Sequence, residues 1–319
     1  MRILLTGSSG WLGRFLSPRL RLQGHEVTGL DVAQGADTQV VGSVADRPLI
    51  DRVFAERGIE AVIHSGALHK PDIVRYPRQA FVDVNVTGTL NLLEAAVAAG
   101  NDRFVFTSTT SLMVSEALRR GEFDRAVWMD EAYAPLEPRN VYGITKLAAE
   151  QLCRLAHREN GLAVCILRTS RFFPEDDDTH RDRSGPNIKA NEFLNRRLTV
   201  EDAAEAHLAA LAKAPEIGLA TFIVSAPPPF GPEDCEALAS DAPAVIERCF
   251  PGAGALYAGA GWRLPERIDR IYVPAAAQER LGFRCSTDFR SVLEALATGG
   301  PLPFAHDPHY VSPKEGARR

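Results

Sequence analysis

Short apolar runs alternate with longer amphipathic stretches over the first 170 residues of the chain. The apolar runs are rich in Val, Ile, Leu and Phe and mostly lack the polar alternation of a strand with one exposed face. They therefore predict strands that are buried on both faces of a parallel sheet. The predicted strands are Arg2–Thr6, Glu26–Asp31, Gln39–Val41, Ala61–His64, Arg103–Ser108 and Ala163–Arg168, and the predicted helices are Gly13–Gln23, Pro48–Arg57, Ala80–Ala99 and Val141–Glu159. This alternation predicts a doubly wound α/β sheet.

The pattern becomes less regular after residue 170. Glu175–Ser184 is a run of charged residues, and the tail Pro301–Arg319 is rich in proline and polar residues, so we expect it to be extended or poorly ordered. The elements predicted in this part are the helices Val200–Ala212, Glu233–Ala239 and Ala275–Leu281 and the strand Thr221–Ser225. We therefore expect a sheet domain over residues 1–170 and a smaller region over 171–319, from which some segments return to the sheet.

Composition narrows the class of protein. The chain has 319 residues, 45% of them hydrophobic, which is enough for a substantial core. A net charge of -5 offers no basic field for nucleic acid or anionic lipid, so we expect neither as a partner. Five scattered cysteines without a CxxC pair favour a reduced, cytoplasmic setting, and we expect no metal site. No apolar run approaches the roughly 18 residues of a membrane span.

Three glycines follow the first predicted strand directly and open a helix. Gly7, Gly10 and Gly13 allow a tight turn and a close approach of the backbone to phosphate, while the helix N-terminus offers free N–H groups. Asp31 ends the second predicted strand, where a carboxylate accepts hydrogen bonds from ribose hydroxyls and repels a 2′-phosphate. The pattern predicts a Rossmann-type dinucleotide site and favours NAD over NADP.

Tyr142 and Lys146 lie four residues apart in a predicted helix, so their side chains share one face. A cation near a phenol stabilises the phenolate and lowers the pKa of the tyrosine toward the working range of an acid/base. Taken alone, such a pair is common and usually reflects packing and a surface lysine.

Several motifs together give the chain a resemblance to the extended short-chain dehydrogenases/reductases, the NAD-dependent epimerase/dehydratase family. The motifs occur in the order typical of that family and cover roughly the first 200 residues. They are TGSSGWLG from Thr6, Asp31, VIHSGA from Val62, NVTGT from Asn85, FVFTST from Phe104, YGITK from Tyr142 and, near the C-terminus, LGF from Leu281.

The resemblance implies a role for each matching residue. Tyr142 is expected to exchange the proton of the substrate hydroxyl or carbonyl, and Lys146 to depress the pKa of Tyr142 and hold the nicotinamide ribose. Thr109 is expected to donate a hydrogen bond to the reacting oxygen, although Ser108 or Thr110 fits if the register differs by one residue. Asn85 is expected to brace the site through backbone hydrogen bonds.

The resemblance also implies binding surfaces for the cofactor and the substrate. The cofactor set is Gly7, Ser9, Gly10, Trp11, Leu12, Gly13, Asp31, Ser43, Val44, Ser65, Gly66, Ala67, Asn85, Thr107, Tyr142, Lys146 and Arg168. The substrate set is His69, Thr109, Thr110, Tyr142 and Arg171. Helices of this family often form a dimer interface, so we expect a homodimer.

The chain departs from the family at three places. Ser43 stands where an acidic residue often contacts adenine, and Arg171 stands in place of the asparagine of nucleotide-sugar epimerases. Only 32 positions separate Arg168 from Val200, so the segment that clamps a nucleotide is short, as it is in uronate dehydrogenases. Arg171 suits a carboxylate of the substrate, or equally an ion pair with the run Glu175–Asp178.

These observations favour an NAD-dependent oxidoreductase that acts on a sugar, sugar acid or polyol. The first alternative is a nucleotide-sugar 4-epimerase that keeps NAD tightly bound. The second is an NAD-binding sensor without catalysis, which the retention of both Tyr142 and Lys146 disfavours.

Overall fold

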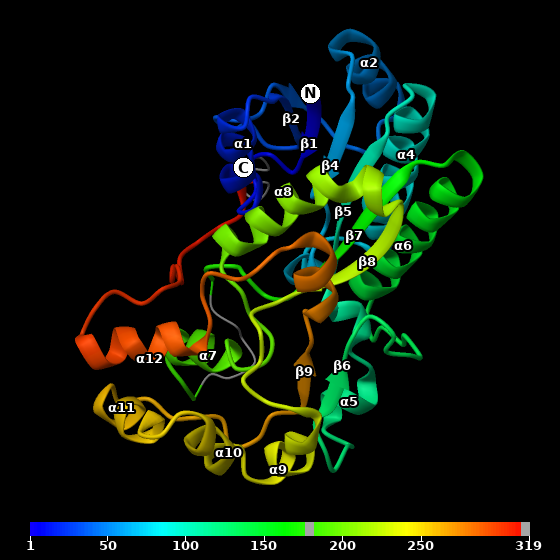
Figure 1. Ribbon diagram of the computed structural model, residues 1–319. Helices are drawn as coiled ribbons and strands as arrows, with labels where there is room; N and C mark the ends of the chain where they lie inside the picture. Colours follow the sequence, from blue (N-terminus) through cyan, green and yellow to red (C-terminus); the bar gives the residue numbers. More distant parts are fainter. Residues whose placement is uncertain (176–181, 314–319) are drawn as a thin grey trace.

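Seven parallel strands form the central sheet of the computed structural model, which describes residues 1–175 and 182–313 (Figure 1). The strand order is β3-β2-β1-β4-β5-β7-β8. The strands are β1 (Arg2–Thr6), β2 (Glu26–Asp31), β3 (Val40–Val41), β4 (Ala61–His64), β5 (Arg103–Thr109), β7 (Ala163–Thr169) and β8 (Leu219–Val224). Strand order changes direction between β1 and β4, the point where doubly wound sheets bind ligands. The predicted doubly wound α/β fold is confirmed.

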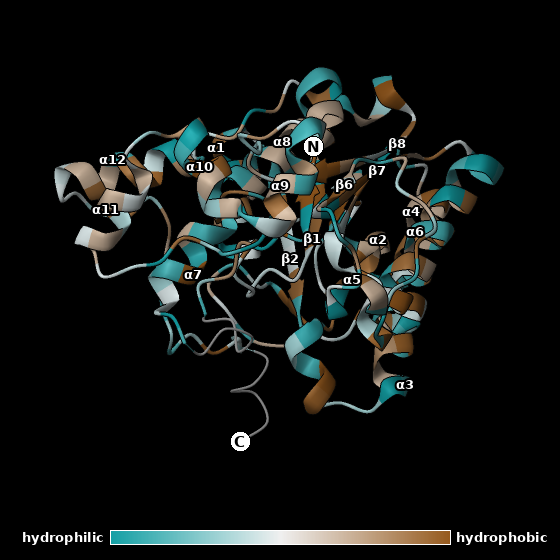
Figure 2. Cartoon of the chain, turned by 90° about the horizontal axis from the view of Figure 1, so that it is seen from below, coloured by the Kyte–Doolittle hydropathy of each residue, from teal (hydrophilic) through white to brown (hydrophobic). Residues whose placement is uncertain are grey.

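Helices cover both faces of this sheet because successive strand residues point to opposite sides. Ile3 and Leu5 pack with α1 (Gly13–Leu22) and α8 (Val200–Ile217) on one face. Leu4 packs on the other face, which is covered by the helices α2 (Arg47–Arg57), α4 (Gly88–Ala98) and α6 (Val141–Asn160). Figure 2 shows the strands as the most hydrophobic part of the interior, with hydrophilic residues on the outer helix faces.

The stretch 80–99, predicted as one helix, is divided into three helical pieces. They are α3 (Arg78–Phe81), the π-helix η2 (Val82–Thr87) and α4. The π-helix contains Asn85, one of the residues implied by the family resemblance. Single-turn π segments are rare and occur often at functional sites, so this irregularity marks the region as one to inspect.

The smaller region surrounds a separate apolar core below the sheet in Figure 1. A two-stranded parallel ribbon pairs β6 (Val127–Met129) with β9 (Arg270–Tyr272). The helices of this region are α5 (Glu116–Arg120), α7 (Gly185–Glu192), α9 (Cys235–Ser240), α10 (Ala242–Cys249), α11 (Ala253–Gly259) and α12 (Phe289–Thr298). Short 3-10 helices of the chain are η1 (Lys70–Val74), η3 (Thr110–Met113) and η4 (Pro232–Asp234), and η5 (Ala277–Leu281) is a further π-helix.

The two regions exchange chain segments. Helix α8 and strand β8 come from the second half of the chain, and β8 forms an edge strand of the central sheet. Helix α5 and strand β6 come from the first half and lie with the smaller region. The carboxyl ends of the sheet strands therefore face a region that is assembled from distant parts of the sequence.

Candidate active site

The turn after β1 is closed by glycines that have no room for a side chain. Gly7 has a φ of +73°, and a Cβ there would lie 2.8 Å from the backbone nitrogen of Gly66. A Cβ on Gly13 would lie 2.2 Å from the carbonyl oxygen of Gly7. Backbone atoms therefore pack directly against each other, and the N-terminus of α1 is left open toward the carboxyl edge of the sheet.

Asp31 is held in place at the end of β2. Its carboxylate oxygens accept hydrogen bonds from the backbone N–H groups of Ser9 and Ala33, both at 3.0 Å. Ser9 also donates its hydroxyl to the carbonyl of Ala33 at 2.8 Å. The turn and the carboxylate thus form one rigid unit, in the arrangement that dinucleotide sites use for pyrophosphate and ribose.

A cleft of about 420 Å³ lies against this turn, and we call it the glycine-turn cleft. Its volume falls within the roughly 300–1,000 Å³ that is typical of cofactor sites. The residues of the expected cofactor set that line it are Gly7, Ser9, Gly10, Trp11, Leu12, Asp31, Ser43, Val44, Ser65, Gly66, Ala67 and Thr107. Gly13 lies behind this wall, where its small size allows helix α1 to approach the turn. The cleft therefore fits a dinucleotide on its shape and its donor set.

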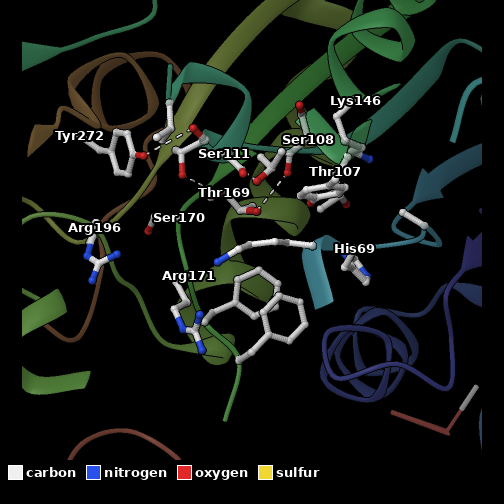
Figure 3. A pocket seen from close by; sticks show the side chains of 18 of the residues that line it. His69, Thr107, Ser108, Ser111, Lys146, Thr169, Ser170, Arg171, Arg196 and Tyr272 are labelled. Carbon is white, nitrogen blue, oxygen red and sulfur yellow. Dashed lines mark hydrogen bonds between the residues drawn. The ribbon is translucent and has the colours of Figure 1, made fainter. Parts of the chain in front are cut away.

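A second cavity of about 170 Å³ lies beside the first, and we call it the tyrosine cavity (Figure 3). The residues of the expected catalytic and substrate sets that line it are His69, Thr109, Thr110, Tyr142, Lys146 and Arg171. The two cavities share the wall residues Ser65, Ala67, His69, Thr107, Phe172 and Phe173. A ligand in one cavity is therefore within reach of a ligand in the other.

Helix α6 carries both Tyr142 and Lys146 into the tyrosine cavity. The helix begins after Asn140, whose side chain accepts a hydrogen bond from the N–H of Gly143, and both functional side chains are buried in its first two turns. Burial raises the pKa of Tyr142 to about 12, against the opposing effect of a hydrogen bond with Thr109. Burial lowers the pKa of Lys146 to about 7. Without a ligand, desolvation is the largest cause of both shifts.

Thr109 is the hydroxyl in the segment 108–110 that meets Tyr142. Its oxygen accepts a hydrogen bond from the N–H of Ser111 and contacts the tyrosine hydroxyl. Ser108 donates to the buried carboxylate of Glu150 at 2.6 Å instead. Thr110 donates to the carbonyl of Thr169 at 3.4 Å. Of the three hydroxyl residues considered from the sequence, the geometry therefore supports Thr109 rather than Ser108 or Thr110.

Arg171 lies at the wall of the tyrosine cavity with its guanidinium partly exposed. It donates to the backbone carbonyl of Glu175 at 3.2 Å and pairs with the carboxylate of Glu192 at 3.7 Å. Residues 176–178 of the charged run lie outside the described residues. Arg171 thus lies on the substrate side, and its described carboxylate partner is Glu192, which lies outside the expected run Glu175–Asp178.

A family model described as the NAD dependent epimerase/dehydratase family matches residues 3–220. The chain belongs to this family. The resemblance drawn from the sequence motifs is therefore confirmed, and the cofactor that the family name specifies is NAD.

Individual relatives vary in their reactions. The chain is 34% identical over 176 residues to a UDP-glucose 4-epimerase of Rhizobium meliloti, a match that covers 52% of this chain and 50% of the relative. It is 27% identical over 180 residues to a uronate dehydrogenase of Pseudomonas syringae pv. tomato, covering 54% of this chain and 60% of the relative. The chain therefore spans only about half the length of the curated relatives that it matches.

A solved structure resembles the chain over nearly its whole length. A short-chain dehydrogenase/reductase superfamily protein from Agrobacterium tumefaciens, solved with bound NAD, is 27% identical with a TM-score of 0.66. The match covers 93% of this chain and 96% of that protein. The similarity supports the family assignment of the sheet domain and extends the likeness into the smaller region.

Asn85 is held by hydrogen bonds between the loop after β4 and helix α6. Its side chain accepts from the N–H of Leu68 at 2.9 Å, donates to the carbonyl of Leu68 at 3.0 Å and donates to the hydroxyl of Thr145 at 3.1 Å. It lines neither cavity among the described residues, so its role in the structure is to fix the loop after β4 against helix α6.

Arg168 differs from the expectation that it contacts the cofactor. Its guanidinium is buried and donates to both carboxylate oxygens of Glu150, at 2.9 and 2.7 Å. Arg168 is absent from the described walls of both cavities. A buried guanidinium needs a charged partner, and Glu150 supplies it inside the protein rather than at the cleft.

Thr107 lies on the wall shared by the two cavities and is positioned by His207. The Nδ1 atom of His207 lies 2.7 Å from the carbonyl of Ala203 and must donate to it, so Nε2 accepts from the Thr107 hydroxyl at 2.7 Å. Burial lowers the pKa of His207 to about 4, which keeps the ring neutral and preserves this arrangement. The sequence offers no local signal for this contact, because 100 positions separate the two residues.

Further polar residues of the tyrosine cavity were missed by the sequence analysis. They are Arg119, Arg139, Ser170, Arg196, Arg270 and Tyr272. Arg270 and Tyr272 lie two positions apart on β9, and the Nε atom of Arg270 donates to the Tyr272 hydroxyl at 3.0 Å. A two-residue spacing in a strand places side chains on one face, but a three-residue strand is too short to be predicted from its pattern.

The described part of the C-terminal tail returns to the glycine turn (Figure 1). Residues 301–312 form no helix or strand. Tyr310 packs edge-on against Trp11 with ring centroids 5.2 Å apart, and the guanidinium of Arg14 lies over both rings. Ser312 and Pro313 line the glycine-turn cleft. The tail therefore adds a wall to the cleft that the sequence motifs do not reveal.

Within the described residues, no group of three or more His, Cys, Asp or Glu side chains is placed to hold a metal ion. Among the helices that the structure describes, none combines the length and the apolar character needed to cross a bilayer.

Proposed function

We propose that this protein is an NAD-dependent oxidoreductase that moves hydride between the nicotinamide and a carbon bearing a hydroxyl or carbonyl group in a sugar, sugar acid or polyol. The observation that carries the proposal is the junction of the two cavities. Thr109, Tyr142 and Lys146 line the tyrosine cavity, and its shared wall opens on the cleft that fits a dinucleotide. When bound, NAD accepts the hydride or returns it.

The side chains of this protein manage the proton and the orientation of the substrate. With its raised pKa, Tyr142 is neutral near pH 7, so it can donate a hydrogen bond, and a proton, to a substrate oxygen. Thr109 contacts the tyrosine hydroxyl and offers a second group to the same oxygen. A ligand anion or a polar ligand near Lys146 would favour its charged form, and this charge would in turn favour the tyrosinate.

The wall of the tyrosine cavity suits a ligand with many hydroxyl groups. Hydroxyl side chains of β5 and η3 line one side of it, and the Tyr272 hydroxyl lies beside η3, where it donates to the carbonyl of Thr110 at 3.5 Å (Figure 3). A sugar or polyol offers a donor and an acceptor at nearly every carbon, so such a wall can pair with several positions at once. This supports the carbohydrate part of the proposal.

The second candidate function is nucleotide-sugar 4-epimerisation, in which one carbon is oxidised and reduced again while NAD stays bound. The similarity to the Rhizobium meliloti UDP-glucose 4-epimerase favours it. The short segment between Arg168 and Val200 favours the dehydrogenase instead, because it leaves less chain to hold a nucleotide.

Incubation with NAD and a panel of aldoses, uronates and polyols tests the proposal through NADH absorbance. We expect at least one substrate to reduce NAD, and Tyr142→Phe to lower kcat by about 10³-fold because the proton donor is lost. Tyr133→Phe is the matched control, since Tyr133 lies outside the described walls of both cavities, and it should retain full activity. Conversion of UDP-glucose without net NADH, with NAD retained through dialysis, would establish the epimerase instead.

A further inference from the structure

Five arginines line the tyrosine cavity, and no carboxylate lines it among the described residues. They are Arg119, Arg139, Arg171, Arg196 and Arg270. The five come from separate segments of the chain, so their convergence is a property of the folded protein rather than of a motif. A wall with this charge favours an anion, because guanidinium groups match oxyanions in geometry as well as charge.

Carboxylates behind the wall compensate this charge only in part. Glu192 pairs with Arg171 and Arg196, but it is shared with the fully buried Arg197, to which it is bound most closely at 2.7 Å. Asp269 pairs with Arg270 at 2.7 Å. Arg119 and Arg139 pair with no carboxylate within residues 1–175 and 182–313.

Glu175 also lies near this cluster, and burial raises the pKa of its carboxyl against the opposing effect of Arg171, Lys189 and Arg197. Even with Glu175 counted as charged, the five arginines meet only three described carboxylates, those of Glu175, Glu192 and Asp269. The described protein therefore leaves a surplus of positive charge at the tyrosine cavity.

Ser170 is a second and independent sign of a ligand at this wall. Its side chain is nine-tenths buried or more, with 3% of the residue exposed, and its hydroxyl has no hydrogen-bond partner among the described residues. A buried hydroxyl without a partner costs free energy, so such groups are rare unless a ligand or water completes them. Ser170 follows β7 directly and lies between Arg171 and Arg196 in Figure 3.

The charged side chains and the catalytic side chains occupy different parts of the cavity. Arg171 and Arg196 lie on the side opposite Lys146 and His69 (Figure 3). The cavity measures about 170 Å³, which is small beside the roughly 300 Å³ lower limit typical of sites for drug-sized ligands. A compact ligand is thus oriented with one end toward the arginines and the other toward Tyr142.

We infer that the substrate is a compact anionic sugar derivative whose oxyanion, a carboxylate or a phosphomonoester, binds Arg196, Arg270 and Ser170 while its reacting carbon lies at Thr109 and Tyr142. This inference rests on the proposed function and names its substrate class. The oxyanion fixes which end of the sugar faces Tyr142. The arginines therefore select both the class of substrate and the carbon that reacts.

The adjoining cavity does not favour a nucleotide as the anion. It measures about 470 Å³ and shares Arg119, Arg196 and Arg270 with the tyrosine cavity. Its described walls contain no aromatic side chain, so a nucleobase would find no ring on which to stack. The arginines are therefore better matched to an oxyanion on the sugar itself.

Steady-state kinetics with three matched sugars tests the inference. Glucose, glucuronate and glucose 6-phosphate present a neutral group, a carboxylate and a phosphomonoester at the same position. We expect one of the two anionic sugars to be preferred over glucose by at least about tenfold in kcat/KM, since a charge-assisted hydrogen bond contributes about 1.5–3 kcal/mol. The preferred anion identifies which oxyanion the site takes.

Substitutions at Arg196 and Ser170 test which side chains bind the oxyanion. Arg196→Gln should raise the KM for the anionic sugar by about 30-fold with kcat within about twofold, and Arg196→Lys should restore part of the loss. Ser170→Ala should raise the same KM by about fivefold without lowering the melting temperature, because its hydroxyl has no partner to lose within the described protein. Arg52→Gln is the matched control, since Arg52 is exposed on α2 and lies outside the described walls of the tyrosine cavity, the adjoining cavity and the glycine-turn cleft.

A binding measurement separates this inference from the proposed function. Calorimetric titration of the NAD-loaded protein with inorganic phosphate and with acetate should show a site that Arg196→Gln weakens by about tenfold and Arg52→Gln leaves unchanged. If no sugar reduces NAD but this binding holds, the proposed function fails and the anion site stands. If neutral sugars are oxidised and Arg196→Gln changes neither KM nor anion binding, the inference is wrong and the proposed function stands.

Discussion

The glycine-turn cleft and the arginine side of the tyrosine cavity are built by opposite means. The cleft is shaped by missing side chains, since Gly7 and Gly13 leave no space even for a Cβ. The arginine side is shaped by long charged side chains such as Arg196 and Arg270 that converge from distant segments. The first design fixes a ligand through backbone geometry, and the second selects it by charge. The difference explains why members of one family share a cofactor while their substrates vary.

Gly13→Ala breaks the first design and carries the largest expected effect. The added Cβ meets the carbonyl oxygen of Gly7 at 2.2 Å and the Cα of Ser8 at 2.7 Å, so the turn must shift. We expect the Kd for NAD to rise by at least about 100-fold, since backbone atoms in close contact cannot yield as a flexible side chain does. Calorimetric titration with NAD measures the effect.

Gly259→Ala is the matched control for that variant. A Cβ at this position meets nothing within 4 Å, and Gly259 lies in α11, away from the described walls of both cavities. Its Kd for NAD and its melting temperature should stay close to those of the native chain. Circular dichroism checks that Gly13→Ala remains folded, and unchanged NAD binding in a folded Gly13→Ala protein would contradict the account of the turn.

The contrast between the glycine-turn cleft and the arginine side of the tyrosine cavity also determines which residues the sequence can predict. The cofactor half depends on residues close together in the chain, such as the turn Gly7–Gly13 and the carboxylate of Asp31, so local spacing reveals it. The three-residue strands β6 and β9 were not predicted, because they are too short for a pattern of alternation to be recognised. Arg270 and Tyr272 on β9 were missed for this reason.

Burial in the folded protein explains why the surroundings of Lys146 and Arg168 could not be predicted from the sequence. In the ligand-free protein, burial raises the pKa of Tyr142 and lowers the pKa of Lys146, which the four-residue spacing of the pair does not reveal. Arg168 was expected at the cofactor, yet Glu150 on α6 binds it in the interior. In each case the residue was identified but its surroundings were not, because desolvation and ion pairing depend on elements that meet only in the fold.

The burial of Lys146 predicts a pH dependence on the catalytic side. The pKa of Lys146 is about 7 in the folded protein against 10.5 for an exposed lysine, so the unfolded chain binds more protons between these two pH values. The free-energy cost of burying Lys146 therefore falls as the pH rises. Lys146→Met should therefore stabilise the NAD-free protein at pH 6 by on the order of 3 kcal/mol, and by much less at pH 9.5. Urea unfolding at the two pH values measures the difference.

Lys213→Met controls for the general effect of removing a lysine. Lys213 is exposed and pairs with Glu216 on the surface of α8, so its substitution should change stability little and equally at both pH values. If Lys146→Met raises the free energy of unfolding equally at pH 6 and pH 9.5, desolvation does not govern the pKa of this lysine.

The tail gives the smallest expected effect, because Tyr310 acts on the glycine-turn cleft indirectly, through its contact with Trp11, which lines the cleft. Tyr310→Ala removes the ring contact with Trp11 and one of the two rings beneath Arg14. We expect the Kd for NAD to rise by about fivefold, consistent with roughly 1 kcal/mol for such a contact. Tyr310→Phe keeps the ring and should bind NAD as the native chain does, and equal affinities for all three proteins would exclude the tail from the cofactor site.

The scattered origin of the arginines has a consequence for how such an enzyme can change. Arg119, Arg139, Arg196 and Arg270 each lie on a separate segment, and none of these segments contributes a described residue to the glycine-turn cleft. Under the proposed function, single substitutions there should alter which substrate is accepted while the cofactor cleft is left unchanged. The smaller region is accordingly the natural target for redirecting this scaffold in the laboratory.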